Sequence, residues 1–272
     1  MTAPRFTHLK AVVFDWAGTM VDHGSKAPMG VFQRAFATFG VEITIDEARG
    51  PMGMAKRDHI AAVIRLPRIA AAWEAVHGHA PGEADIDRVY EVFVPLNIEV
   101  VTDYADLIPG AAETAARLRA GGLKIGSTTG YTREIMAPLL PLAAAQGYAP
   151  DNLVCAGDLP AGRPTPLMMY RTFLDLNVWP AWTTVKVDDT EVGVEEGLNA
   201  GCWTVGVALT GNVFGLDAEE TDALSNEAFE EMRAAAYGKL ARAGAHFVID
   251  SVDELPAVLD EIEGALARGE RP

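Results

Sequence analysis

Apolar residues follow two different patterns along the chain. Between residues 24 and 102 they recur every three to four positions, which is typical of helices that bury one face. No strong strand candidate occurs in that stretch. Before and after it, short apolar runs alternate with helical stretches, and such alternation predicts a parallel sheet covered by helices on both faces.

The first apolar run, LKAVVF at residues 9–14, predicts a buried central strand that stops abruptly at Asp15. Further strands are expected at 123–127, 153–156, 184–187, 203–207 and 246–249. Helices are expected at 111–120, 132–146, 190–199, across most of 217–243 and at 252–267. One more helix is predicted to start at Pro164, because the first helical position favours proline.

The stretch without strands is expected to contain helices at 28–39, 44–49, 54–65, 68–77 and 86–101, with a loop at 77–85. This helical block interrupts the alternation directly after the first strand. The sequence therefore predicts the α/β class, with a Rossmann-like parallel-sheet core of residues 1–23 and 103–272. Residues 24–102 are predicted to form an α-helical cap domain inserted into that core.

Composition narrows the possible partners. The chain has 272 residues, 49% of them hydrophobic, which suffices for a large core. Its 22 basic and 38 acidic residues give a net charge of −16, which disfavours nucleic acid and anionic membranes as partners. Cys155 and Cys202 lie in apolar stretches and are expected to be reduced core residues. No apolar run resembles a signal peptide or spans a bilayer, so a cytoplasmic location is expected.

Polar residues follow four of the predicted strands. Asp15 ends the first, the segment STTG at 127–130 the second, Arg163 follows the third, and Asp188 with Asp189 ends the fourth. Each has an ordinary explanation by itself, as a helix cap or a surface cation. The carboxyl ends of parallel strands meet at one sheet edge, so together these residues predict a site for an anion and a metal ion.

The arrangement of these residues resembles that of a known superfamily. The chain resembles the haloacid dehalogenase superfamily in its helical insertion after the first strand and in the order Asp15, Thr129, Arg163, Asp189. The resemblance implies that Asp15 is a nucleophile that becomes an aspartyl-phosphate, and that Thr129 and Arg163 hold the phosphoryl group. It also implies Mg²⁺ at the acidic pair, a cation that prefers oxygen ligands and screens the repulsion between carboxylate and phosphoryl group.

Two positions depart from the superfamily pattern. Phosphatases of the superfamily carry a second aspartate that protonates the leaving group, and Ala17 stands there instead. Loss of that general acid should cost a phosphomonoesterase about 10²- to 10⁴-fold in rate. Gly193 stands where a further acidic residue is usual. The metal shell would then be completed by Asp188, Glu191 or water, and the sequence leaves all three open.

The cap offers a group that makes the missing acid unnecessary. In PMGMAKRDH, Lys56 and His59 are three residues apart and lie on one helix face, with Met52 beside them. Partial desolvation would lower the pKa of the lysine, and a neutral amine can form an imine with an aldehyde. If that aldehyde bears a phosphonate on its α-carbon, the carbon can leave phosphorus as an enamine, with no acid at Ala17.

The segments DWAGT, PMGMAKRDH and GSTTGYTRE closely resemble the phosphonatase family of that superfamily. The resemblance extends over nearly the whole chain and includes KVDD, EGLNAGCWTVGVAL and GAHFVIDS. It implies hydrolysis of the carbon–phosphorus bond of phosphonoacetaldehyde, a small-molecule substrate, to acetaldehyde and phosphate. It also implies a homodimer, for which Val31, Phe32 and Phe36 could supply the surface or could equally form the core of the cap.

By this resemblance the candidate site residues have distinct roles. Asp15 is the nucleophile, Lys56 forms the Schiff base, and His59 helps to move protons. Substrate-binding residues are Met52, Thr129, Gly130, Tyr131 and Arg163, and Mg²⁺ is held by Asp15, the carbonyl of Ala17 and Asp189. The alternatives are a phosphatase or phosphosugar mutase in which Lys56 anchors phosphate, and a non-catalytic binding protein, which Gly193 weakly favours.

Overall fold

A computed structural model describes residues 5–272 of the chain. Its described residues form a six-stranded parallel sheet in the order β3-β2-β1-β4-β5-β6. The strands are β1 (Ala11–Phe14), β2 (Lys124–Thr129), β3 (Val154–Cys155), β4 (Thr184–Asp188), β5 (Trp203–Val207) and β6 (Phe247–Ile249). The predicted α/β fold with a Rossmann-like core is confirmed. β1 is fully buried between β2 and β4, so the sequence that follows it emerges at the centre of the sheet edge.

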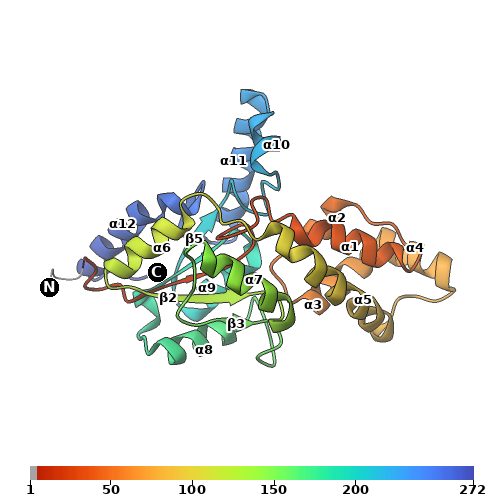
Figure 1. Cartoon of the computed structure of the whole chain (residues 1–272), viewed down its shortest axis with the longest axis horizontal. Coiled ribbons are helices and arrows are strands. Elements are labelled where there is room, and N and C mark those ends of the chain that lie inside the picture. The colour runs from red at the N-terminus through yellow and green to blue at the C-terminus, as the bar shows by residue number, and fades with distance from the viewer. Residues whose placement is uncertain (1–4) are drawn as a thin grey trace.

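Helices connect the strands and cover the sheet. Figure 1 shows α6 and α12 side by side on one side of the sheet and α8 on the other. The N-caps of α7, α9 and α11 are Thr132, Thr190 and Ser225, whose hydroxyls accept backbone N–H groups and fix where these helices begin. The helices are α6 (Ala111–Ala120), α7 (Arg133–Ala145), α8 (Leu167–Leu176), α9 (Glu191–Ala200), α10 (Ala218–Asp222), α11 (Asn226–Arg242) and α12 (Leu255–Ala267).

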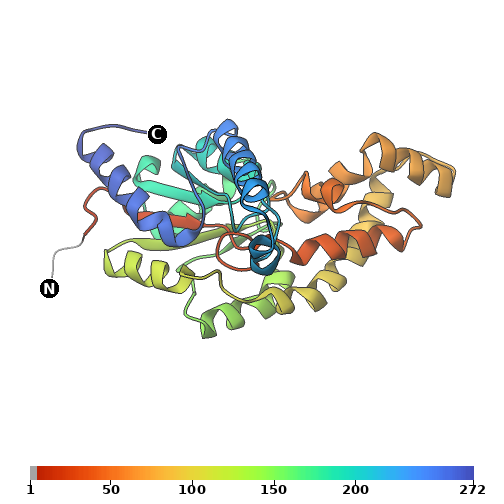
Figure 2. The same cartoon turned by 90° about the horizontal axis from the view of Figure 1, so that it is seen from above.

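Residues 24–102, all described by the structure, contain helices and no strand, as predicted. The helices are α1 (Ala27–Ala37), α2 (Ile45–Arg49), α3 (Lys56–Ile64), α4 (Pro67–His77) and α5 (Glu83–Val101). Figures 1 and 2 show them gathered at one end of the molecule, away from both termini. We call residues 24–102 the helical insertion. Its division from the core as a separate domain stays a prediction, and residues 1–4 of the predicted core lie outside the described residues.

The helical insertion has an apolar core of its own. α1 packs along α5, and α3 packs on α5 as well. Val31, Phe32 and Phe36 of α1 are buried in that packing, and the Phe32 ring lies 4.4 Å from the ring of Phe93 on α5. The alternative that these three residues form a dimer surface is therefore wrong.

The predicted helix exists as α8, but its predicted start at Pro164 is wrong. α8 begins at Leu167, because the residues before it form a turn in which the Thr165 hydroxyl donates to the Gly162 carbonyl at 2.7 Å. The carbonyl of Pro164 accepts from the Asn199 amide at 2.9 Å instead of from a helical N–H. Arg163 consequently lies in an irregular segment after β3 and not at a helix N-terminus.

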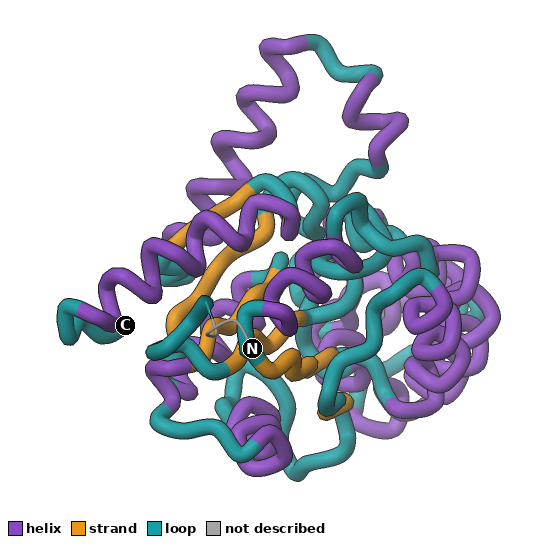
Figure 3. Tube along the Cα trace, turned by 60° about the vertical axis from the view of Figure 1, so that its left-hand side comes forward, coloured by secondary structure: helices purple, strands orange, loops and turns teal. Residues whose placement is uncertain are grey.

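Other boundaries shift by a few residues. α5 starts at Glu83, inside the predicted loop, because the Asp85 carboxylate accepts the Gly82 N–H at 2.9 Å and caps the first turn. β2 runs through Thr129, two residues further than predicted, since it pairs there with β3. The mostly helical stretch 217–243 is a hairpin of α10 and α11, whose helices project from the body of the protein (Figure 3).

Two composition-based expectations can be compared with the fold. Cys155 and Cys202 are buried and form no disulfide within the described chain. From residue 5 to residue 272, no helix combines the length and the apolar character needed to cross a membrane.

Candidate active site

The carboxyl ends of the two central strands bring three carboxylates together. Asp15 follows β1, Asp188 ends β4 and Asp189 follows it, and oxygens of all three lie within 4.8 Å of one another. Gly18, with φ of +81°, makes this approach possible, because a Cβ there would lie 2.2 Å from an Asp189 oxygen. The sequence predicted this edge correctly, since strand ends in a parallel sheet converge there.

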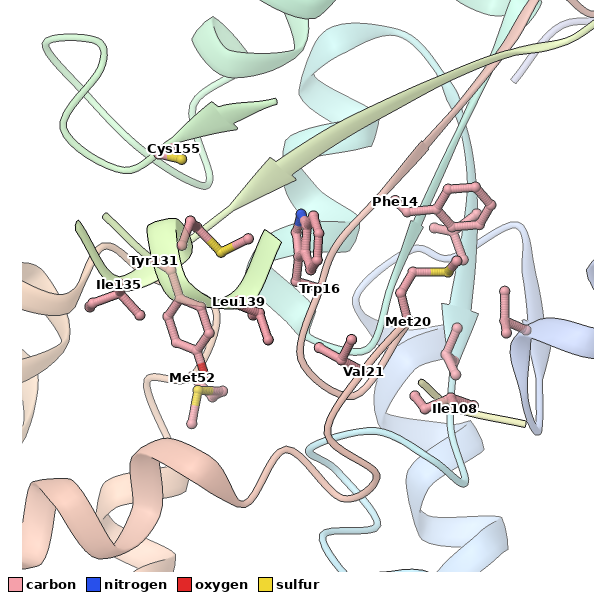
Figure 4. Packing of buried hydrophobic residues seen from close by; sticks show 14 of the residues in the cluster. Phe14, Trp16, Met20, Val21, Met52, Ile108, Tyr131, Ile135, Leu139 and Cys155 are labelled. Carbon is pink, nitrogen blue, oxygen red and sulfur yellow. The ribbon is translucent and has the colours of Figure 1, made fainter. Parts of the chain in front are cut away.

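A cavity opens at this edge, between the core and the helical insertion. Every predicted site residue except His59 lines it, and so do three that the sequence did not single out, namely Ser25, Gly53 and Thr190. Figure 4 shows Tyr131, just after β2, pointing toward Met52 of the helical insertion. Both halves of the predicted site thus face the same cavity.

The helical insertion touches the core directly beside this cavity. A Cβ on Gly53 (φ +89°) would lie 2.4 Å from the Thr190 hydroxyl oxygen. A Cβ on Gly130 would lie 2.7 Å from the carbonyl oxygen of Met54. Contacts this short leave no space for a side chain at either position, so both glycines are needed for the observed closure.

Lys56 is buried in mainly apolar surroundings. Lys56 is the first residue of α3, and only 3% of its surface is exposed. Its Nζ lies 3.7 Å from the Met52 sulfur. The ammonium position is 5.0 Å from the ring centre of Tyr131 and 5.6 Å from that of Phe32. Burial lowers the pKa of Lys56 to about 8, while the charge of Asp15 opposes the shift.

His59 lies on α3 with Lys56, but it does not line the cavity. Its ring stacks on Phe32 with 4.0 Å between ring centres, and Nε2 lies 2.6 Å from the carbonyl oxygen of Ala48. A carbonyl only accepts, so Nε2 carries the hydrogen and Nδ1 keeps a lone pair. Nδ1 is buried and has no hydrogen-bond partner within the described residues. Burial, followed by the charge of Lys56, lowers the pKa of His59 well below its usual value.

Arg163 is held by the core from several sides. Nη2 lies 2.8 Å from Asp15 and 3.4 Å from Asp188, and donates to the Thr128 carbonyl at 2.6 Å. Nε donates to Glu196 at 3.1 Å. The guanidinium therefore has a fixed orientation at the cavity wall, which suits it to bind an oxyanion.

A second buried cation, Lys186, completes this network. Its Nζ lies 3.0 Å from Asp188 and 3.2 Å from Glu196, and donates to the Thr128 hydroxyl at 2.7 Å. Neither Lys186 nor Glu196 was predicted from the sequence as part of the site. A lysine inside the apolar strand VKVD was a usable signal, because a buried cation requires a partner. Glu196 gave no signal, being one of several acids on α9.

Only one of the hydroxyls at the end of β2 is free to act in the cavity. The Ser127 hydroxyl donates to the Phe14 carbonyl at 3.0 Å, and the Thr128 hydroxyl donates to Glu196 at 2.9 Å. Thr129 lines the cavity, and its hydroxyl oxygen accepts the Tyr131 N–H at 3.1 Å. The hydroxyls of Ser127 and Thr128 are therefore engaged by the protein itself, and among the three hydroxyls of the STTG segment only that of Thr129 faces the cavity.

The carboxylates fit a divalent cation. Burial raises the pKa of Asp15 to about 6, and it raises that of Asp189 well above its usual value, with help from the charges of Asp15 and Asp188. One Asp189 oxygen is buried and has no hydrogen-bond partner in the described chain. Four buried carboxylates, those of Asp15, Asp188, Asp189 and Glu196, face only two buried cations in this network, so a cation with two charges would balance it.

The chain was compared with known proteins. Its residues 9–201 match the family of haloacid dehalogenase-like hydrolases. It is 61% identical to a phosphonoacetaldehyde hydrolase of Paraburkholderia phytofirmans over 97% of this chain and 99% of the relative, and 60% identical to that of Paraburkholderia xenovorans over the same shares. A crystal structure of a phosphonoacetaldehyde hydrolase-like protein from Oleispira antarctica superposes with a TM-score of 0.96 at 44% identity, covering 100% of this chain and 98% of that one.

Proposed function

The chain belongs to the haloacid dehalogenase-like hydrolases, and from this premise we propose that it hydrolyses phosphonoacetaldehyde to acetaldehyde and phosphate. The observation that carries the proposal is Lys56, a buried amine with a pKa of about 8, in the same cavity as Asp15. The 61% identical relative named phosphonoacetaldehyde hydrolase supports it over nearly the whole chain. An amine that loses its proton near neutral pH suits attack on an aldehyde.

In the proposed first step, neutral Lys56 adds to the aldehyde carbon, water leaves, and the imine nitrogen takes up a proton. The carbon of this protonated imine is two bonds from phosphorus. An oxygen of Asp15 then attacks phosphorus, the carbon–phosphorus bond breaks, and its electron pair forms an enamine. Because the imine accepts these electrons, no acid is needed at Ala17. Water hydrolyses the aspartyl-phosphate, the enamine takes up a proton, and a second water releases acetaldehyde from Lys56.

Other residues of the cavity orient the phosphonyl group. Arg163, fixed by Asp15 and Glu196, offers a guanidinium to the phosphonyl oxygens. The Thr129 hydroxyl can donate there too, because its recorded contact with Tyr131 uses only its oxygen as acceptor. Met52, Tyr131 and the backbone of Gly130 enclose the aldehyde end and exclude water.

We include Mg²⁺ in the proposal, held by Asp15, the carbonyl of Ala17 and Asp189. When bound, Mg²⁺ would neutralise the carboxylates and let an anionic nucleophile approach an anionic phosphonate. The support is the unpartnered Asp189 oxygen and the excess of buried carboxylates over cations.

His59 is proposed to move protons to and from the nitrogen of Lys56. Its Nδ1 is unprotonated in the observed contact geometry, and its face of α3 is that of Lys56. Since His59 does not line the cavity, this role would act through Lys56 and not on the substrate directly.

Closure, assembly and context belong to the same proposal. Residues 24–102 would act as a cap that opens to admit substrate, and the enzyme would work in the cytoplasm in 2-aminoethylphosphonate degradation.

A homodimer is supported by exposed apolar side chains on and after α8, above all Leu174 (78% exposed) and Trp179 (71% exposed). Light scattering of the protein and of a Leu174→Lys variant tests this, with a monomer expected for the variant.

Borohydride trapping tests the chemistry. Substrate plus borohydride should leave a reduced two-carbon adduct on Lys56, detected by mass spectrometry, and should stop turnover. A Lys56→Met variant is the matched control and should give no adduct. Continued turnover with unmodified Lys56 would show that the imine step is wrong.

A further inference from the structure

The loop between β5 and α10 joins the sheet edge to the helical insertion. We call residues 208–217 the β5–α10 loop. The N–H of Asn212 in this loop donates to an Asp189 oxygen at 2.7 Å. Gly24, the first residue of the insertion, donates its N–H to the Thr210 carbonyl at 2.8 Å. The β5–α10 loop is therefore fixed beside the cavity and also meets the chain where it enters the insertion.

Arg49 of the insertion binds this loop with both terminal nitrogens of its guanidinium. It is the last residue of α2, and its Nη2 donates to the Gly215 carbonyl at 2.7 Å. Its Nη1 donates to the Gly24 carbonyl at 3.0 Å and to the backbone and side-chain oxygens of Asn212 at 3.2 and 3.1 Å. All four acceptors are uncharged oxygens. Arginine suits such a set, because its planar group carries five donors in a fixed geometry.

The backbone of the loop is shaped around this guanidinium. Gly215 has a φ of +76°, and an ideal Cβ on it would lie 2.9 Å from the Arg49 Cζ. A side chain at position 215 would therefore displace the guanidinium. Asn212 is buried, and buried oxygens that lose their donor cost free energy. The contact thus depends on both partners and cannot be replaced by water without loss.

Arg49 and Lys56 stand at the two ends of one irregular segment. Residues 50–55 connect α2 to α3 and are not helical. Gly53, in the middle of this segment, lies against Thr190 of the core, and Lys56 follows the segment and lines the cavity. The position of an irregular segment is set by its ends and its contacts. The binding of Arg49 to the core therefore bears on where Lys56 lies.

We propose that Arg49 is a positioning residue of this active site, which ties residues 50–55 to the β5–α10 loop and thereby holds Lys56 near Asp15 in the closed state. This inference rests on the proposed function, in which Lys56 attacks the aldehyde. Arg49 does not line the cavity, so it acts through the position of Lys56 and not on the substrate. Its loss should favour the open insertion without unfolding either part.

A purely stabilising role for Arg49 makes a different prediction. Arg68 provides the comparison, because it binds the Glu47 carboxylate of α2 and the Glu42 carbonyl, and both partners lie within the insertion. If Arg49 only stabilised the insertion, Arg49→Gln and Arg68→Gln would lower the melting temperature and leave the kinetics of the folded enzyme unchanged. If Arg49 positions Lys56, only Arg49→Gln changes the kinetics and the exposure of residues 50–56.

Hydrogen exchange of the full chain without substrate, followed by mass spectrometry, is the first test. The amides of residues 50–56 should exchange about tenfold faster in Arg49→Gln than in the original protein, and at an unchanged rate in Arg68→Gln. Thermal melting checks that both variants are folded. Unchanged exchange in a folded Arg49→Gln, or equal acceleration in both variants, would overturn the proposal.

Kinetics give the second test. In Arg49→Gln, kcat/KM for acetaldehyde release should fall about 10- to 100-fold, and in Arg68→Gln by less than about threefold. The rise of kcat/KM with pH should also move from about pH 8 toward the ordinary lysine pKa of about 10, because an open insertion admits water to Lys56. The substitution leaves in place the charged and titratable groups that act on Lys56, namely Asp15, Asp22, His59, Arg163 and Asp189. A fall in kcat/KM with an unchanged pH profile would contradict the proposal.

The same contact can be broken from the core. Gly215→Ala should displace the guanidinium while keeping its charge, and should reproduce both the faster exchange and the shifted pH profile. Gly269→Ala is the control and should change neither, because Gly269 also has a positive φ (+87°) but nothing within 4 Å of its Cβ position. If Arg49→Gln does not fold, the comparison of these two alanine variants decides.

Combining the two changes tests whether they break one contact. The double variant Arg49→Gln with Gly215→Ala should have kcat/KM within about threefold of Arg49→Gln alone. Losses that multiply in the double variant would mean that the two residues act separately, and the proposal would be wrong.

The proposed reaction can fail independently of this inference. Exchange is measured without substrate, whereas acetaldehyde release from phosphonoacetaldehyde tests the function. Faster exchange in Arg49→Gln, together with an original protein that releases no acetaldehyde, would refute the reaction alone. Acetaldehyde release by the original protein, together with unchanged exchange in Arg49→Gln, would refute the inference alone.

Discussion

The two sides of the cavity bury charge in opposite ways. On the core side, Arg163 and Lys186 lie among buried carboxylates at 2.8 to 3.4 Å. On the side of the helical insertion, Lys56 is equally buried but has a sulfur atom and two aromatic rings as its nearest recorded contacts. The same class of residue is therefore placed in two different environments a short distance apart.

The difference determines which groups stay charged. Burial alone would lower the pKa of Arg163, but the charges of Asp188, Asp15 and Glu196 raise it above its usual value. For Lys56 burial prevails, and the pKa falls to about 8. A permanently charged guanidinium suits the binding of an oxyanion, whereas an amine that gives up its proton suits addition to a carbonyl group.

The largest expected effect comes from placing a permanent positive charge at position 56, on the side of the helical insertion. Lys56→Arg keeps the cation but cannot form an imine, so acetaldehyde release should fall about 10⁴-fold or more. Lys26→Arg is a matched control at a partly exposed salt bridge to Asp217 and should retain activity. A Lys56→Arg enzyme with more than about a tenth of the original rate would favour the phosphate-anchor alternative.

The next largest effect is expected from breaking the buried ion pairs on the core side. Glu196→Gln removes the one carboxylate that pairs with Arg163 through Nε and also with Lys186, and should lower the free energy of unfolding by about 3 kcal/mol. Glu191→Gln on the same helix removes a half-exposed partner of Lys239 and should cost less than about 1 kcal/mol.

Urea unfolding measures both of these variants. Loss of orientation of Arg163 should also raise KM for the substrate in Glu196→Gln. Equal stability losses in the two variants would mean that the buried ion pairs of Glu196 contribute no more to stability than the half-exposed pair of Glu191 with Lys239.

The contact between the two sides can be weakened alone. Gly53→Ala adds a Cβ that would lie 2.4 Å from the Thr190 hydroxyl oxygen. The cavity then cannot close as observed, and kcat/KM should fall about 10- to 100-fold. Gly78→Ala is the control, because Gly78 also has a positive φ (+78°) but has nothing within 4 Å of its Cβ position.

Both alanine variants should lose about 1–2 kcal/mol of stability, because each forces alanine into a left-handed conformation. Steady-state kinetics and thermal melting separate the two effects. A similar loss of kcat/KM in Gly78→Ala would indicate general destabilisation and not failure of closure.

The smallest effect concerns the protonation of Lys56. Below its pKa of about 8 the amine is protonated and cannot attack the aldehyde, so activity should rise with pH. Between pH 7 and pH 9 the neutral fraction, and with it kcat/KM, should increase about tenfold and then level off. Stopped assays of acetaldehyde over this range provide the measurement. A profile that is flat from pH 7 to pH 9 would show that imine formation does not limit kcat/KM.

Sequence patterns identified most of the site because each candidate lies next to a regular element. Thr129 ends a buried strand and Asp15 and Asp189 directly follow two others, whose apolar runs are visible in the sequence. Lys56 begins a helix shortly after two methionines. Patterns failed where long-range contacts decide the local structure. Asn199 binds the carbonyl of Pro164, and this contact between distant residues belongs to the turn that delays the start of α8.

The sequence by itself determined the order of strands and helices, the sheet edge at which the chemistry gathers, and the residue types present there. These follow from local periodicity and from the geometry of parallel sheets. Only the tertiary structure decided that Thr128 faces Glu196 while Thr129 faces the cavity, that Lys56 is buried with no carboxylate of the described chain in salt-bridge contact, and that Asp188 fills the space beside Gly193. The physical reason is that burial and charge pairing depend on atoms brought together from distant parts of the chain, and no local pattern encodes those distances.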